Sequence, residues 1–190
     1  MNGHFARFYE DDESYSEVLI GYLGNGLEDG ESCIVIGTPD HREILDKRLR
    51  GRIRLKSAST NYGGRYFLLD AAETLSRIMV DGWPDRERFT EVIGGQIAQA
   101  RKVGNGQVRV FGEMVNLLFA AGEAEKAVRL EELWNGLGAQ QNFFVFCSYS
   151  TLTPHFEKNR ESLGDICKLH SAICVPSTSS FSGIQRPRFF

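Results

Sequence analysis

Polar and aromatic side chains follow each strand-like segment of this sequence, where they can meet a ligand. Glu113 comes just after an apolar segment, and a buried carboxylate there needs a paired or bound partner. His41 lies next to Asp40, and because histidine side chains generally change charge near neutral pH, it can serve as a ligand or a proton switch. Tyrosines combine an apolar wall with a hydroxyl, as a small-molecule pocket requires. The candidate ligand-binding residues are Tyr9, Thr38, Asp40, His41, Asp70, Glu113, Met114, Tyr149 and His170.

The first turn of the chain has the wrong chemistry for a nucleotide phosphate. A phosphate-binding loop needs glycines, whose backbone approaches the phosphates, and a lysine that neutralises charge. Residues 9–14 instead read Tyr-Glu-Asp-Asp-Glu-Ser, and their acids would repel a triphosphate. We therefore expect no nucleotide hydrolysis here, assign no catalytic residue, and predict that the protein is not an enzyme.

The histidines and cysteines do not form a recognisable metal motif. The four cysteines are Cys33, Cys147, Cys167 and Cys174, and no CxxC pair is present. A site made of His4, His41, Cys147 and His170 is conceivable, but nothing in their spacing requires it. The Asp11–Asp12 pair could hold a divalent cation, but helix capping by acids in the first turn explains it better. We predict no metal and no cofactor.

Strand and helix signals alternate along most of the chain. The apolar run 32–36 has strand length and suits a strand covered on both faces, as in a parallel sheet. Alternation of this kind predicts an α/β fold with a doubly wound, mostly parallel sheet of about five strands flanked by helices. Ligands of such sheets bind beyond the carboxyl ends of the strands. The predicted strands are 4–9, 32–36, 65–69, 108–111 and 142–147, with a surface loop at 51–64 and a last helix at 157–172. Tyr15 belongs to the apolar stripe of the helix predicted after the first strand. Thr38-Pro39 and Asp70 mark the predicted starts of two further helices.

Length and charge limit the classes of partner. The 190 residues suit one domain, which we place at 1–174, followed by a flexible tail at 175–190. With 22 basic and 25 acidic residues the net charge is −3, which argues against nucleic acid as a partner. No apolar run approaches the ~18 residues needed to span a bilayer. Residues 1–9 lack an apolar secretory core, so we expect a cytoplasmic protein without a membrane partner.

Short motifs follow one another in a fixed order along the chain. They are His4 and Tyr9, Thr38-Pro39-Asp40-His41, Leu69-Asp70-Ala71, Phe111-Gly112-Glu113-Met114, Arg129-Leu130-Glu131 to Trp134, Cys147-Ser148-Tyr149, and His170. No single motif is specific, but the ordered set covers roughly residues 3–174. This set resembles the MEDS family, sensory domains named for methanogen, methylotroph and DcmR-type regulators. The order of segments also resembles a RecA-type domain of the circadian-clock KaiC kind, with the phosphate loop and catalytic acids lost.

The resemblance implies a non-catalytic sensor of small molecules such as simple hydrocarbon derivatives. Domains of this family occur in prokaryotic histidine kinases, transcription regulators and anti-sigma-type proteins. We recognise no output domain in this chain, so we expect its signal to pass to such a partner protein, with a homodimer also compatible. Two other functions stay open: a degenerate RecA-like domain that still binds a nucleotide, and a ligand-free interaction module.

Overall fold

A single parallel sheet organises the molecule. The computed structural model describes residues 3–56 and 62–174. Within them, six parallel strands lie in the order β3-β2-β6-β7-β1-β8. Strand β2 is buried along its whole length, as its run of Cys, Ile and Val requires. The strands are β1 (Gly3–Tyr9), β2 (Ser32–Gly37), β3 (Tyr66–Asp70), β6 (Val108–Gly112), β7 (Phe144–Ser150) and β8 (Ala172–Cys174).

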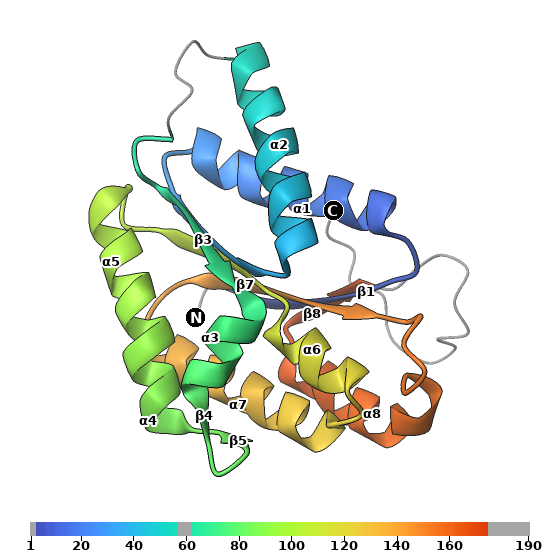
Figure 1. Cartoon of the computed structure of the whole chain (residues 1–190). Helices are drawn as coiled ribbons and strands as arrows, with labels where there is room; N and C mark the ends of the chain where they lie inside the picture. Colours follow the sequence, from blue (N-terminus) through green and yellow to red (C-terminus); the bar gives the residue numbers. More distant parts are fainter. Residues whose placement is uncertain (1–2, 57–61, 175–190) are drawn as a thin grey trace.

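Helices cover both faces of this sheet (Figure 1). Two of them, α1 (Asp12–Glu28) and α2 (Pro39–Lys56), pack together on one face. A short hairpin of β4 (Met79–Val80) and β5 (Trp83–Pro84) lies at the edge of the opposite layer. That layer contains α3 (Ala71–Ile78), α4 (Arg86–Phe89), the π-helical turn η1 (Thr90–Gly94), α5 (Gly95–Val103), α6 (Met114–Ala120), α7 (Ala124–Gln140), the 3-10 turn η2 (Glu157–Asn159) and α8 (Arg160–Leu169).

The predicted α/β architecture is confirmed, but several details differ. Strand β7 spans Phe144–Ser150 and not 142–147, so Tyr149 lies within the strand and not beyond its end. Strand β8 is a sixth strand that pairs with β1, and its three residues are too few to show a pattern. Helix α2 continues to Lys56, so residues 51–56 of the predicted loop are helical. The last helix ends at Leu169, and its first residues form a 3-10 turn. The predicted tail at 175–190 lies outside the described residues.

The alternation of side chains along β7 separates two environments. Cys147 and Tyr149 face the layer that contains α7 and α8, where they join the larger hydrophobic core. Phe146 points to the other face, toward α1 and α2. Ser148 shares that orientation because neighbouring residues of a strand point to opposite faces. Polar groups on this one strand therefore serve two separate sites.

No helix of the described residues is long and apolar enough to cross a membrane.

The predicted cap of α3 is present and can be tested. Oδ1 of Asp70 accepts a hydrogen bond from the Glu73 backbone N–H at 2.9 Å, and Oδ2 lies 3.0 Å from Nη2 of Arg42. We expect Asp70→Ala to lower the free energy of unfolding by about 1 kcal/mol, because the first turn loses its cap. Urea denaturation measures this change. A value within about 0.3 kcal/mol of wild type would contradict the capping role.

Candidate functional site

A polar cluster surrounds Glu113 at the carboxyl edge of the sheet. The Glu113 side chain is fully buried. The residues that contact it come from α1, from α2, and from the turn between β2 and α2. Its Oε2 accepts hydrogen bonds from the Thr38 backbone N–H at 2.8 Å and from the Thr38 hydroxyl at 3.3 Å. Its Oε1 lies 2.5 Å from His41 Nδ1 and accepts the Tyr15 hydroxyl at 3.0 Å. We call Tyr15, Thr38, His41, Glu113 and Ser148 the strand-end cluster.

Local sequence explains how these side chains meet. Glu113 directly follows β6, and Thr38 directly precedes the helix α2 that starts at Pro39. A carboxylate near a helix N-terminus is favoured by the unpaired backbone N–H groups there. Gly37 allows the approach, since a Cβ at this residue would lie 3.2 Å from Oε2 of Glu113. The Gly-Thr-Pro turn thus brings a helix start to a buried acid.

Aromatic rings enclose the inner side of the strand-end cluster. The Tyr15 ring stacks on Tyr9 with a centroid distance of 4.1 Å, and Phe111 meets it edge-on at 6.1 Å. The Tyr15 hydroxyl also contacts the Ser148 hydroxyl at 2.9 Å. Burial, together with the nearby Glu113 charge, raises the pKa of Tyr15 well above its ordinary value. Tyr15 therefore stays a neutral donor at physiological pH.

The structure divides the predicted site residues among several places. Thr38, His41 and Glu113 meet in the strand-end cluster, and Tyr9 lies beside it. Tyr149 and His170 lie in a second cluster on the other face of the sheet. The remaining three predicted residues are members of neither cluster. Asp40 is exposed, and Met114 is part of the hydrophobic core. Asp70 caps α3 and pairs with Arg42.

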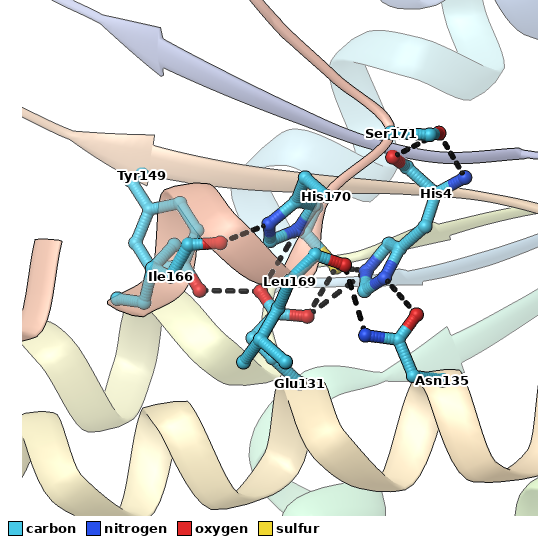
Figure 2. A network of polar contacts seen from close by, with 9 residues as sticks. His4, Glu131, Asn135, Tyr149, Ile166, Leu169, His170 and Ser171 are labelled. Carbon is cyan, nitrogen blue, oxygen red and sulfur yellow. Dashed lines mark hydrogen bonds and ion pairs between the residues drawn. The ribbon is translucent and has the colours of Figure 1, made fainter. Parts of the chain in front are cut away.

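The second cluster lies between the sheet and helices α7 and α8 (Figure 2). Its centre is Glu131, a fully buried carboxylate on α7. Glu131 Oε2 lies 3.0 Å from Nε2 of His4 and accepts the Cys147 thiol at 3.4 Å. Glu131 Oε1 accepts the Tyr149 hydroxyl and lies 3.3 Å from Nε2 of His170. We call His4, Glu131, Cys147, Tyr149 and His170 the buried histidine cluster.

Opposite charges explain the protonation of this second cluster. Burial alone would raise the pKa of Glu131, but the charges of His170 and His4 outweigh it and hold that pKa well below its ordinary value. Burial alone would lower the pKa of His170, yet the Glu131 charge raises it overall. Burial and the same carboxylate raise the pKa of Cys147 and of Tyr149. Glu131 is therefore an anion amid groups that keep their protons.

Two central residues were not among the sequence-predicted site residues. Tyr15 was assigned to the apolar stripe of its helix, and its hydroxyl gives no sequence signal. Glu131 did carry a signal, because it lies four residues after Ala127 and three before Trp134, both core residues. That spacing places an acid on the apolar face of α7, where it needs a buried partner.

Removal of a single hydroxyl tests the strand-end cluster. Tyr15→Phe keeps the stacked ring but removes one donor to Glu113, leaving the buried carboxylate less satisfied. We expect the free energy of unfolding to fall by about 1–3 kcal/mol. Chemical denaturation measures the change, and Tyr22→Phe is a control because the buried Tyr22 hydroxyl makes only a long contact of 3.4 Å to a carbonyl. Equal losses in both variants would contradict a specific role for Tyr15.

Comparisons with known proteins place the chain in a family. No curated protein matches its sequence. A solved structure from Pyrococcus horikoshii OT3, the subject of a structural study, aligns with a TM-score of 0.48 and 11% identity over 92% of this chain and 81% of that chain. The family model described as the methanogen/methylotroph, DcmR sensory domain matches residues 3–171. The chain therefore belongs to the MEDS family of sensory domains.

Proposed function

We propose that this protein is a non-catalytic sensory domain that binds a small organic molecule at the strand-end cluster and signals through a partner protein. Membership of a sensory family supports the sensory role. The location of the proposed ligand site rests on Glu113, a fully buried carboxylate at the carboxyl end of the central strand β6. Open α/β sheets bind their ligands at this edge.

His41 is the point of entry to this carboxylate. The His41 side chain is 15% exposed, whereas that of Glu113 is fully buried, so a molecule from solvent meets the imidazole first. A ligand that donates a hydrogen bond can replace His41 Nδ1 at Oε1 of Glu113. This exchange keeps the buried acid satisfied, as a carboxylate in such surroundings requires.

The walls of the cluster indicate the chemical class of the ligand. Tyr9, Tyr15 and Phe111 form an aromatic surface beside the carboxylate. A molecule that combines a hydroxyl or amino group with a small apolar part matches this arrangement. Tyr15 stays neutral at physiological pH, so it favours binding and orientation over proton transfer. These properties support a sensor and not an enzyme.

Helix α2 is the element that can report occupancy. It begins directly after Thr38 and carries His41 in its first turn. It packs with α1 on one face of the sheet (Figure 1). Displacement of His41 would shift the start of this helix. A ligand changes the equilibrium between two such positions only by its differential affinity for them. We propose that a prokaryotic partner, such as a histidine kinase, an anti-sigma factor or a transcription regulator, recognises the surface that changes.

Native mass spectrometry of the purified protein tests the ligand proposal. We expect a small organic molecule bound to the folded protein and released on denaturation. That compound and its chemical relatives should then raise the melting temperature of wild type and of Asp40→Asn. The same compounds should raise that of His41→Gln much less, because His41 lies in the cluster and Asp40 is exposed.

Each alternative function gives a different result in the same experiments. A co-purified nucleotide, or a magnesium-dependent thermal shift with ATP, would support the degenerate RecA-like function and contradict ours. Equal shifts in wild type and His41→Gln would place the ligand elsewhere. No response to organic compounds or ATP, together with stable self-association, would favour the ligand-free interaction module. A partner pull-down that saturating ligand leaves unchanged would contradict the signalling step.

A further inference from the structure

We propose that the buried histidine cluster is a zinc site, in which His4, Glu131, Cys147 and His170 bind one Zn²⁺. Each of these four residues offers one ligand atom, and the four atoms all lie within 4.8 Å of one another. The proposed site lies on the opposite face of the sheet from the strand-end cluster. The inference therefore does not depend on the proposed function.

Fixed hydrogen bonds determine which nitrogen of each histidine faces the centre. Asn135 Nδ2 donates to the Leu169 carbonyl at 2.8 Å, which leaves Asn135 Oδ1 to accept from His4 Nδ1 at 3.0 Å. His170 Nδ1 donates to the Ile166 carbonyl at 2.6 Å, because a carbonyl can only accept. Figure 2 shows both arrangements. Nδ1 therefore carries a proton in both rings, and Nε2 is the nitrogen that each ring presents to the cluster.

Those two nitrogens face atoms that also accept. His4 Nε2 lies 3.0 Å from Glu131 Oε2, and His170 Nε2 lies 3.3 Å from Glu131 Oε1 without hydrogen-bond alignment. A lone pair against a carboxylate oxygen is repulsive unless a positive charge lies between them. A proton can supply that charge to a ring in the metal-free protein, whereas one metal cation supplies it to both nitrogens at once. A metal-binding histidine usually donates its other ring N–H, here at Nδ1, to a hydrogen-bond acceptor, as both rings do in this cluster.

The spacing fits tetrahedral zinc. With Zn–N and Zn–O near 2.0–2.1 Å and Zn–S near 2.3 Å, ligand atoms of a tetrahedron lie about 3.3–3.7 Å apart. Cys147 Sγ lies 3.5 Å from His4 Nε2 and 3.4 Å from Glu131 Oε2. These three atoms already have nearly tetrahedral spacing. The full set with His170, whose atoms lie within 4.8 Å of one another, must contract somewhat around the ion.

Charge and ligand type select the metal. Two neutral imidazoles, one thiolate and one carboxylate balance the two positive charges of Zn²⁺, so the buried site becomes neutral. The Cys147 thiol, and any ring that carries a proton on Nε2, give that proton to water as the bonds to zinc form. Thiolate and imidazole ligands favour zinc over magnesium or calcium, which prefer oxygen.

The position of the ligands indicates a structural role. They come from β1, α7, β7 and the end of α8, so one ion joins the first strand to the last helix. Tyr149 donates to Glu131 Oε1 and holds the carboxylate in place. Four protein ligands would close the coordination sphere, as in structural zinc sites.

The test begins with the wild-type protein after removal of any affinity tag. Elemental analysis should find one zinc per chain that survives dialysis and is removed by a chelator. X-ray absorption at the zinc edge should give one sulfur and three nitrogen or oxygen neighbours. This measurement needs no variant, so it stays decisive even if a substitution impairs folding.

Cobalt binding then assigns the ligands. Co²⁺ added to the metal-free protein should give a thiolate-to-cobalt absorption band in wild type and in the control Cys167→Ser, whose thiol lies on α8 outside the cluster. The band should vanish in Cys147→Ser. Asn135→Ala removes the acceptor that anchors His4, together with the hydrogen bond to the Leu169 carbonyl. It should weaken zinc binding about 10–100-fold. Near-ultraviolet circular dichroism checks that each variant is folded.

Several results would overturn the proposal. One is a wild-type protein that retains no zinc when purified and binds none at micromolar concentration. Another is a zinc spectrum without a sulfur neighbour. A cobalt band that persists in folded Cys147→Ser, or one lost in Cys167→Ser, would assign the metal to other thiols.

Discussion

Glu131→Gln is expected to lower the free energy of unfolding of the metal-free protein by about 3–5 kcal/mol, the usual cost of breaking a buried ion pair. Glutamine keeps the size of the side chain and can still accept from Tyr149. It removes the charge that faces Nε2 of His4 and of His170, both buried. Urea denaturation near pH 6 in the presence of a chelator measures the loss.

The neighbouring residue gives a matched control. Glu132 is exposed on the same helix and pairs with Arg129 at 3.0 Å across the surface. We expect Glu132→Gln to change the free energy of unfolding by no more than about 0.5 kcal/mol, because exposed pairs contribute little. Similar losses in the two variants would show that the buried Glu131 charge contributes no more to the free energy of unfolding than an exposed one.

The pH dependence of this loss follows from the two shifted groups. The pKa of Glu131 is lowered, so its contribution is complete above the ordinary glutamate pKa and decreases as pH falls through the folded value. The pKa of His170 is raised, so its contribution is complete below the ordinary histidine pKa and is lost as pH rises through the folded value. The difference between wild type and Glu131→Gln should therefore be largest between about pH 4.3 and 6.5. Denaturation curves that extend below and above this range would contradict the assignment if the difference stayed constant on both sides.

Much of the fold was predictable because its signals are local. Apolar runs such as 32–36 and the start signals Thr38-Pro39 and Asp70 each depend on a few adjacent residues, and all three are present as expected. Strand β8 gave no such signal, because its three residues become a strand only by pairing with β1. The length of α2 beyond residue 50 was also missed, because Gly51 suggested a break that the helix tolerates.

The candidate site was only partly predictable because strand order and face are not local properties. The rule that ligands bind at strand ends brought Thr38, His41 and Glu113 together correctly. It misplaced Tyr149, because the predicted strand ended at residue 147. Strand β7 continues to Ser150, so the neighbouring Ser148 and Tyr149 point to opposite faces of the sheet. Three members of the conceivable metal set, His4, Cys147 and His170, do converge, but Glu131 takes the place expected for His41.

Glu113→Ala is expected to have an effect on the free energy of unfolding as large as that of Glu131→Gln, about 3–5 kcal/mol. Alanine removes the acceptor for the Thr38 backbone N–H, the His41 ring and the Tyr15 hydroxyl. The buried Tyr15 hydroxyl then keeps only Ser148, and the first turn of α2 loses its anion. Urea denaturation measures the loss, with Glu125→Ala, an exposed acid in the first turn of α7, as the matched control.

A second variant separates the charge of Glu113 from its size. Glu113→Gln can still accept from Thr38 or Tyr15, but its amide group brings donors to a place where every neighbour donates. We therefore expect Glu113→Gln to lose most of the stability that Glu113→Ala loses, despite its matched size. If Glu113→Gln were as stable as wild type, the carboxylate charge would be dispensable. The strand-end cluster would then be ordinary core packing, and the reason to place a ligand beside Glu113 would disappear.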